Sequence, residues 1–149
     1  LLSVRSGSAR IHFTEEKFEN PEVPPMFCML MRKYLSSAKL IDVAQNGLER
    51  VVELKFSATN EMGDRVILKL VCELIGNSSN AILVNEEGRI IDSIRRSDIE
   101  TASRLIQPGA KYEYPPKMDK LNILNENTEK IANEILAKGE IPLIRLLIK

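Results

Sequence analysis

Arg50 is the residue of this 149-residue sequence whose type and position most favour a chemical contact. It follows the dipeptide Asn46-Gly47, which is typical of tight hairpin turns, and it stands directly after Glu49. An arginine held at a hairpin tip can meet a phosphate or a base edge in a fixed pose, because its guanidinium group is planar and always charged. The residue types alone predict either a nucleic-acid contact at this turn or an ordinary solvated pair of charges.

Further basic side chains are spread along the sequence and can converge on one surface. They are Arg32-Lys33, Arg65, Arg89, Arg95-Arg96 and Arg104. The charge of the whole chain is balanced, since it has 21 Lys and Arg residues and 21 Asp and Glu residues. This balance excludes a highly basic nucleic-acid-binding domain and an acidic disordered tail, but it permits a local basic patch.

Residue types suited to catalysis or metal binding are scarce in this sequence. His12 is its one histidine and no G-x-S-x-G sequence accompanies it, so a Ser-His-Asp set has no support. The seven glycines are isolated, which leaves no phosphate-binding loop. Cys28 and Cys72 lie in apolar surroundings without zinc-site spacing, which predicts free thiols in a reducing compartment, with a disulfide as the alternative. We therefore expect no cofactor and no metal.

Antiparallel strands joined by short turns must position these residues. Apolar and polar residues alternate with a period of two after residue 39, and Asn46-Gly47, residues 60–64 and residues 86–88 provide the turns. Short connections imply antiparallel pairing. The predicted strands are 40–45, 50–59, 65–75, 80–85 and 89–94, with a strand end at 9–14 before them.

A helix is predicted over residues 26–37, directly after Pro25, whose missing N-H costs nothing in a first helical turn. Its apolar residues recur at spacings of three and four, which gives one stripe: Phe27, Leu30, Met31, Tyr34 and Leu35. The longest apolar runs of the sequence are too short to form a membrane helix.

The C-terminal third is less regular. Residues 95–107 fit a loop or a short helix. Asn125 or Asn127 can cap a helix over residues 126–138, and a further helix begins at Pro142. The chain has no initiator Met and stops within an apolar periodic run, so we expect it to be a piece of a longer protein.

The stretch from Glu19 to Lys33, which reads E-N-P-E-V-P-P-M-F-C-M-L-M-R-K, closely resembles the N-terminal domain of the NFACT family. Bacterial members of that family were named fibronectin-binding protein A and include RqcH-like ribosome quality-control factors. Further motifs agree in the same order over residues 8–116: R-I-H at 10–12, Q-N-G-L-E-R at 45–50, N-E-M-G-D at 60–64, E-L-I-G at 73–76 and L-I-Q-P-G-A-K-Y at 105–112.

This resemblance implies an α+β fold, with an antiparallel β-sheet sandwich or meander and a packed helix. Such a fold is similar to the N-terminal domain of formamidopyrimidine-DNA glycosylases and is followed by C-terminal helices. Residues 1–116 would form the β-rich domain, with its start missing, and residues 117–149 the start of a helix-hairpin-helix-like region. The glycosylases use an N-terminal proline amine as nucleophile, which the family lacks, so we expect no enzyme.

The resemblance also implies which residues form the site. The family motif G-L-D-R, associated with tRNA handling, falls on Glu49 and Arg50, where glutamate keeps the charge but lengthens the side chain by one methylene. The family motif G-R-H-S-N reads G-N-S-S-N from Gly76 and has lost its Arg and His. We expect tailing activity to be reduced or absent. The nucleic-acid-binding residues implied are Glu49, Arg50, Asn77, Ser78 and Asn80.

The function implied by the resemblance is that of a cytoplasmic, non-enzymatic RNA-binding module. It would bind obstructed large ribosomal subunits and tRNA and promote alanine tailing of stalled chains, without contact with a membrane. The alternative is a cell-surface adhesin that binds fibronectin or fibrinogen, and a DNA glycosylase-like enzyme is a third hypothesis. Because the charge is balanced, we expect the module to position RNA that other domains bind more strongly.

Overall fold

The computed structural model describes residues 1–97, 103–116 and 127–137 of the chain. The chain divides into two compact units, Leu1–Pro115 and Pro116–Lys149. The first unit contains two antiparallel sheets, helix α1 and all five residues predicted to bind nucleic acid.

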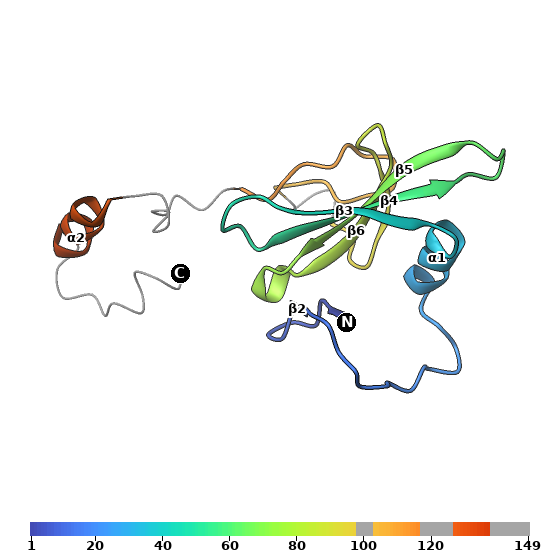
Figure 1. Ribbon diagram of the computed structural model, residues 1–149, viewed down its shortest axis with the longest axis horizontal. Helices are drawn as coiled ribbons and strands as arrows, with labels where there is room; N and C mark the ends of the chain where they lie inside the picture. The colour runs from blue at the N-terminus through green and yellow to red at the C-terminus, as the bar shows by residue number, and fades with distance from the viewer. Residues whose placement is uncertain (98–102, 117–126, 138–149) are drawn as a thin grey trace. The chain divides into compact units, whose positions relative to one another are not determined.

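Five antiparallel strands form a meander in the first unit, in which each strand pairs with its neighbours along the chain (Figure 1). Short turns between segments of alternating apolar and polar residues favour this topology over any crossover. The predicted succession of antiparallel strands and the α+β class are confirmed. The strands are β3 (Lys39–Gln45), β4 (Val51–Thr59), β5 (Arg65–Glu73), β6 (Asn80–Val84) and β7 (Ile90–Ser93).

Strands β4 and β5 pair over nine residues without a register shift, from Val51 opposite Glu73 to Thr59 opposite Arg65. Strand β3 lies at the edge of the sheet, and all seven of its residues are exposed. Three of its apolar side chains, Leu40, Ile41 and Val43, are more than half exposed. The edge strand is therefore held by its pairing with β4 and not by burial.

Helix α1 (Met26–Leu35) covers one face of the sheet, below it in Figure 1. The predicted apolar stripe is confirmed, because Phe27, Leu30, Met31, Tyr34 and Leu35 pack against Ala58, Leu68 and Leu83. Pro25 precedes the helix, and its carbonyl accepts hydrogen bonds from the N-H groups of Cys28 and Met29.

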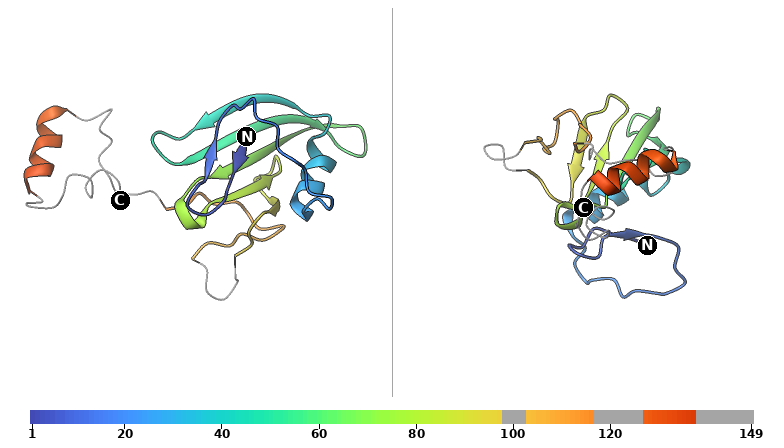
Figure 2. Two further views of the ribbon diagram at one scale, coloured as in Figure 1. Left: turned by 90° about the horizontal axis from the view of Figure 1, so that it is seen from below. Right: turned by 90° about the vertical axis from the view of Figure 1, so that its left-hand side faces the viewer.

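The N-terminal hairpin lies on the same face as α1. It consists of β1 (Leu2–Ser3) and β2 (Arg10–Ile11), and Figure 2 shows it in front of the sheet in the view from below. Leu2 and Val4 pack against a buried cluster of Leu70, Cys72 and Ala81. Only the second strand of this hairpin was expected from the sequence, since β1 is too short to show alternation.

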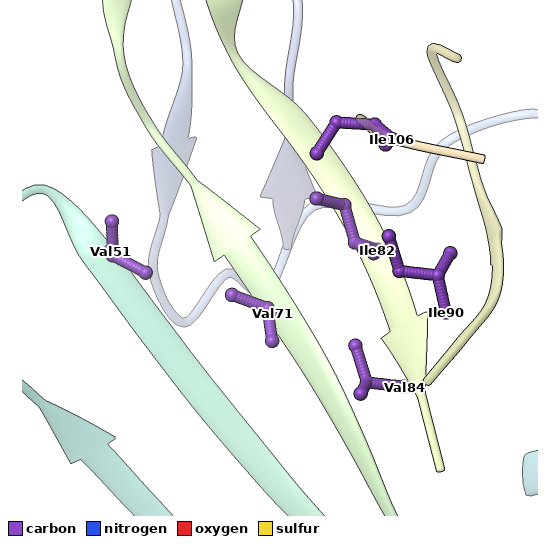
Figure 3. Close-up of a cluster of buried hydrophobic side chains, with 6 residues drawn as sticks. All are labelled: Val51, Val71, Ile82, Val84, Ile90 and Ile106. Atoms are coloured by element: carbon purple, nitrogen blue, oxygen red, sulfur yellow. The ribbon is translucent and has the colours of Figure 1, made fainter. Parts of the chain in front are cut away.

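The opposite face of the sheet holds the second part of the core. Val51, Val71, Ile82, Val84, Ile90 and Ile106 form one buried cluster there (Figure 3). Ile106 reaches the cluster from the segment after β7, and Ala110 and Tyr112 pack beside it. Residues 95–97 and 103–107 contain no helix, whereas residues 98–102 lie outside the described part of the chain.

The two cysteines are free thiols, as predicted. Cys28 is half-buried on α1 and Cys72 is fully buried on β5. Burial raises the pKa of the Cys72 thiol to about 12, because the low-dielectric surroundings disfavour the thiolate.

The described part of the second unit is helix α2 (Thr128–Ala137). Asn127 caps it, as its side-chain oxygen accepts a hydrogen bond of 2.8 Å from the N-H of Lys130. The helix predicted from Pro142 falls on residues that are not described. Among those that are, no helix has the length and apolar character needed to span a membrane.

Candidate nucleic-acid interface

The five predicted site residues come together at one end of the sheet. There β4 begins at Val51, β5 ends at Glu73 and β6 begins at Asn80, and the register places Glu73 opposite both of the other two residues. The β3–β4 turn, which carries Glu49 and Arg50, and the β5–β6 connection therefore leave the sheet side by side. We call this sheet end, residues 46–50 and 74–80, the candidate interface.

Two hydrogen bonds to backbone carbonyls define the conformation of the β3–β4 turn. The N-H of Glu49 donates to the carbonyl of Asn46 at 3.1 Å, and the Gln45 side chain donates to the carbonyl of Glu49 at 2.9 Å. Gly47 has a φ of 57°, which only glycine adopts without strain. Five residues separate the strands, so the connection is longer than the two-residue hairpin that Asn-Gly indicates.

Arg50 presents an exposed guanidinium group at this turn. Within the described residues, its side chain forms no hydrogen bond or ion pair, and the same holds for Glu49. The Arg-carboxylate pair expected from the sequence is therefore not formed. Because no protein partner competes for it, the guanidinium group of Arg50 is available to an external anion.

The connection between β5 and β6 contains the short helix η1 (Gly76–Ser78). Ser79 donates its hydroxyl to the carbonyl of Gly76 at 2.8 Å, which closes the turn. Asn77 and Ser78 are exposed, and the side-chain oxygen of Asn77 accepts a hydrogen bond from the Ser6 hydroxyl at 2.6 Å. Both residues thus present polar groups on the surface at the same sheet end as Arg50.

Asn80 points inward, unlike the two residues before it. It is 5% exposed, and its side-chain oxygen accepts hydrogen bonds from the N-H groups of Ala81 and Arg95, both at 3.0 Å. Its amide nitrogen donates to the carbonyl of Arg95 at 2.7 Å. This buried amide holds the β5–β6 connection against residue 95, and a nucleic-acid contact by Asn80 stays a prediction.

The exposed Arg95 also holds the β5–β6 connection in place, through hydrogen bonds to its backbone. Its guanidinium group donates to the carbonyls of Asn77 at 3.2 Å, Ser79 at 2.6 Å and Val4 at 3.2 Å. The sequence places it only among the scattered basic residues, because nothing local indicates that it returns to residues 77 and 79. Its positive charge lies at the interface, but its donors are largely used by the protein.

A buried carboxylate lies directly behind the interface. Glu73 is 1% exposed and receives two hydrogen bonds from the guanidinium group of Arg104, at 2.8 and 2.7 Å. The hydroxyl of Tyr112 donates a third, at 2.9 Å. Burial next to this carboxylate raises the pKa of Tyr112, so the phenol stays protonated and remains a donor. No local pattern of the sequence connects these three residues, although a glutamate within the apolar run of β5 is a signal that a partner is needed.

The side chains at this sheet end suit anion and hydroxyl recognition. They offer one free guanidinium group, an amide and a hydroxyl, which are groups that contact phosphate and ribose oxygens. Within the described residues there is no cluster of three His, Cys, Asp or Glu side chains that could hold a metal ion.

Solved structures place this fold among the N-terminal domains of bacterial fibronectin-binding proteins. The chain superimposes on the N-terminal domain of fibronectin-binding protein PavA from Streptococcus pneumoniae with a TM-score of 0.78 and 35% identity, covering 93% of this chain and 55% of that one. For the fibrinogen binding protein from Staphylococcus aureus the TM-score is 0.81 at 28% identity, with 98% and 51% covered. The expected likeness to DNA glycosylases stays a prediction.

Sequence comparison then defines the family. Residues 1–149 match the family described as NFACT N-terminal and middle domains, and the chain belongs to this family. It is 36% identical to the Rqc2 homolog RqcH of Bacillus subtilis over 137 residues, covering 91% of this chain and 24% of that protein. It is 29% identical over 145 residues to the human ribosome quality control complex subunit NEMF, covering 94% and 12%. The chain thus spans a quarter or less of these relatives.

Proposed function

We propose that this chain is the RNA- and ribosome-binding module of a cytoplasmic ribosome quality-control factor. In this proposal it binds obstructed large subunits, contacts their tRNA through Arg50, and promotes alanine tailing of stalled chains without being an enzyme itself. The names of its relatives, Rqc2 homolog and ribosome quality control complex subunit, support the general role. The unpaired guanidinium group of Arg50 at a well-defined turn is the observation that supports the contact.

The chemistry of the candidate interface favours positioning over tight electrostatic binding. A guanidinium group can hold a phosphate through two parallel hydrogen bonds, and Asn77 and Ser78 can bond to ribose or phosphate oxygens. With 21 basic and 21 acidic side chains, the chain has little excess charge to attract RNA over a distance. Stronger binding then belongs to parts of the full-length protein outside these residues.

Two departures from the family motifs bear on the tailing activity. Glu49 stands where the motif has aspartate, and it is half-buried beside Arg50 and forms no ion pair with any residue that the structure describes. Asn77 and Ser78 stand where the motif has Arg and His, which removes two cationic donors. We propose that the protein retains a tRNA contact through Arg50 but tails stalled chains less efficiently than members that carry the full motifs.

The test compares two arginine variants of the full-length protein. Arg50→Ala removes the free guanidinium group at the candidate interface, and Arg65→Ala removes an exposed one at the opposite end of the same strand pair. Co-sedimentation with large subunits that carry peptidyl-tRNA, and alanine tailing, should each fall about tenfold for Arg50→Ala, as for the loss of one charge-assisted contact. Both should stay unchanged for Arg65→Ala. Equal binding and tailing by the wild type and Arg50→Ala would refute the role of Arg50.

Fibronectin or fibrinogen binding is the second candidate function. The names of the solved neighbours favour it, and so does the exposed edge strand β3, since extended peptides can add to an open sheet edge. Saturable binding of fibronectin to the intact protein on washed, unlysed cells would support this function. Absence of the protein from the cell surface would exclude it.

A further inference from the structure

The Glu73 carboxylate ties β5 to a distant segment of the chain. Within the described residues, Arg104 and Tyr112 supply all of its side-chain hydrogen bonds, and both belong to the segment that covers the Val51 face of the sheet. The same guanidinium group donates to the carbonyl of Glu113 at 2.6 Å and lies over the Tyr112 ring, with its carbon 5.8 Å from the ring centroid. The end of β5 is therefore clamped from one side.

Arg104 is not one of the surface cations that the sequence suggests. Its side chain is 17% exposed, and the ion pair with Glu73 and the carbonyl of Glu113 occupy its guanidinium group. A phosphate would have to displace a buried carboxylate to reach it, which is costly because the carboxylate would be left unpaired. A direct RNA contact by Arg104 is thus disfavoured.

The backbone connects the hydrogen-bonded Glu73 to Arg50. Glu73 lies opposite Val51 in the β4–β5 register, and the next residue, Leu74, donates its N-H to the carbonyl of Arg50 at 2.8 Å. Any shift at the end of β5 therefore moves the carbonyl of Arg50 as well. Because the Arg50 side chain has no partner among the described residues, the position of its backbone is what restrains the region that its guanidinium group can reach.

We propose that Arg104 and Tyr112 are positioning residues for RNA binding, which act through Glu73 and Leu74 to hold Arg50 in its binding pose. This inference rests on the proposed function and deepens it. Tyr112→Phe is the sharpest probe, because it removes one hydrogen bond to Glu73 and keeps the ring in the core. Tyr34→Phe on α1 is the matched control, since the Tyr34 hydroxyl forms no hydrogen bond within the described residues and lies on the other face of the sheet.

The experiment is a double-mutant cycle in the full-length protein. Binding to two probes, purified total tRNA and large subunits that carry peptidyl-tRNA, is measured for Tyr112→Phe, Arg50→Ala and the double variant. The temperature is kept well below the Tm of each, so that every variant is folded. We expect Tyr112→Phe to weaken binding about threefold in the wild-type background and not at all in the Arg50→Ala background, since a residue acting only through Arg50 has nothing left to position. Tyr34→Phe should bind like the wild type.

Arg104→Lys provides an independent measurement. Lysine keeps the charge next to Glu73 but cannot form the paired hydrogen bonds, so its loss of binding should equal or exceed that of Tyr112→Phe and should also vanish in the Arg50→Ala background. A loss that persists unchanged in the Arg50→Ala background would overturn the positioning role. So would wild-type binding by Tyr112→Phe and Arg104→Lys while Arg50→Ala binds weakly, although the proposed function would then stand. If Arg50→Ala binds like the wild type, the proposed RNA contact by Arg50 fails and the positioning role fails with it.

Discussion

Leu74 donates its backbone N-H to the carbonyl of Arg50 at 2.8 Å, just beyond the last paired residues of β5 and β4. This hydrogen bond joins the two connections that form the candidate interface. It also links the free guanidinium group of Arg50 to the buried carboxylate of Glu73, one residue before Leu74. The stability of the domain and the geometry of its interface are therefore connected, and separate measurements can test each.

Loss of Arg104 should strongly destabilise the fold. Arg104→Met leaves the buried Glu73 carboxylate without its ion-pair partner, which costs about 3 kcal/mol of unfolding free energy. Urea unfolding followed by circular dichroism measures this change. Lys33→Met, which breaks an ion pair between two exposed side chains, is the control and should leave the unfolding midpoint unchanged. Similar unfolding midpoints for the two variants would show that the buried Arg104–Glu73 ion pair contributes no more to stability than the exposed one.

Asn80 should contribute to the stability of the fold, and Asn77 should contribute to RNA binding. Asn80→Ala leaves the N-H groups of Ala81 and Arg95 without their side-chain acceptor, whereas the carbonyl of Arg95 keeps the Ser93 hydroxyl as a donor, so we expect a loss of about 2 kcal/mol in unfolding free energy. Asn77→Ala affects an exposed side chain and should weaken RNA binding with little change in stability. The same urea titration, together with tRNA binding, compares the two. An unchanged stability for Asn80→Ala would show that its buried amide is dispensable.

Much of the fold follows from local patterns in the sequence. The period of two predicts β3 to β7 within one or two residues at most ends, and the three- and four-residue spacing from Phe27 to Leu35 predicts the face of α1 that packs on the sheet. These features depend on neighbours in the chain. Glycine and asparagine between these segments predict short turns, and short turns can join only antiparallel neighbouring strands.

The interactions that cannot be predicted from the sequence are hydrogen bonds between residues far apart in the chain. Arg104 is 31 residues from Glu73, and Arg95 is 16 residues from Ser79. Both lie in or next to a segment without periodicity, so no pattern indicates where they return to the sheet. The inward orientation of Asn80 does not follow from the sequence either, because a motif shows which residues are adjacent in sequence but not which of them turns inward.

The ion pair of Asp92 and Arg96 should make stability depend on pH in the acid range. Hydrogen bonds from Arg96, opposed in part by burial, hold the pKa of Asp92 below its ordinary value of 3.8. Because the folded-state pKa lies below the unfolded-state value, the ionised carboxylate stabilises the fold above the unfolded-state pKa, and this contribution is lost as the pH falls through the folded-state pKa. Arg96→Met should therefore unfold at a lower urea concentration than the wild type at pH 7. The difference should shrink steadily below pH 3.8, and a difference that persists at low pH would argue against this ion pair.

The two thiols should react at different rates. The pKa of Cys72 is raised to about 12 by burial, so almost none of this thiol is ionised at pH 8, and it is also inaccessible. Cys28 is half-buried and is expected to react first with iodoacetamide. Mass spectrometry of digested samples measures labelling at each site, and unfolding in urea should make the two rates similar. Faster labelling of Cys72 in the folded protein would contradict its burial.

The salt dependence of tRNA binding should fall when the Arg50 contact is lost. Each phosphate contact contributes about 0.7 to the slope of log Kd against log salt concentration for single-stranded nucleic acid and about 0.9 for a duplex. Arg50→Ala should reduce the slope by about that amount, whereas Arg65→Ala should not. Equal slopes for Arg50→Ala and the wild type would indicate that Arg50 binds no phosphate.

Co-sedimentation of the full-length protein with large ribosomal subunits that carry peptidyl-tRNA measures the proposed contact of Arg50 most directly. We expect Arg50→Ala to bind about tenfold more weakly than the wild type, and Arg65→Ala to bind as the wild type does. Undiminished binding by Arg50→Ala, with its fold intact by circular dichroism, would contradict the account.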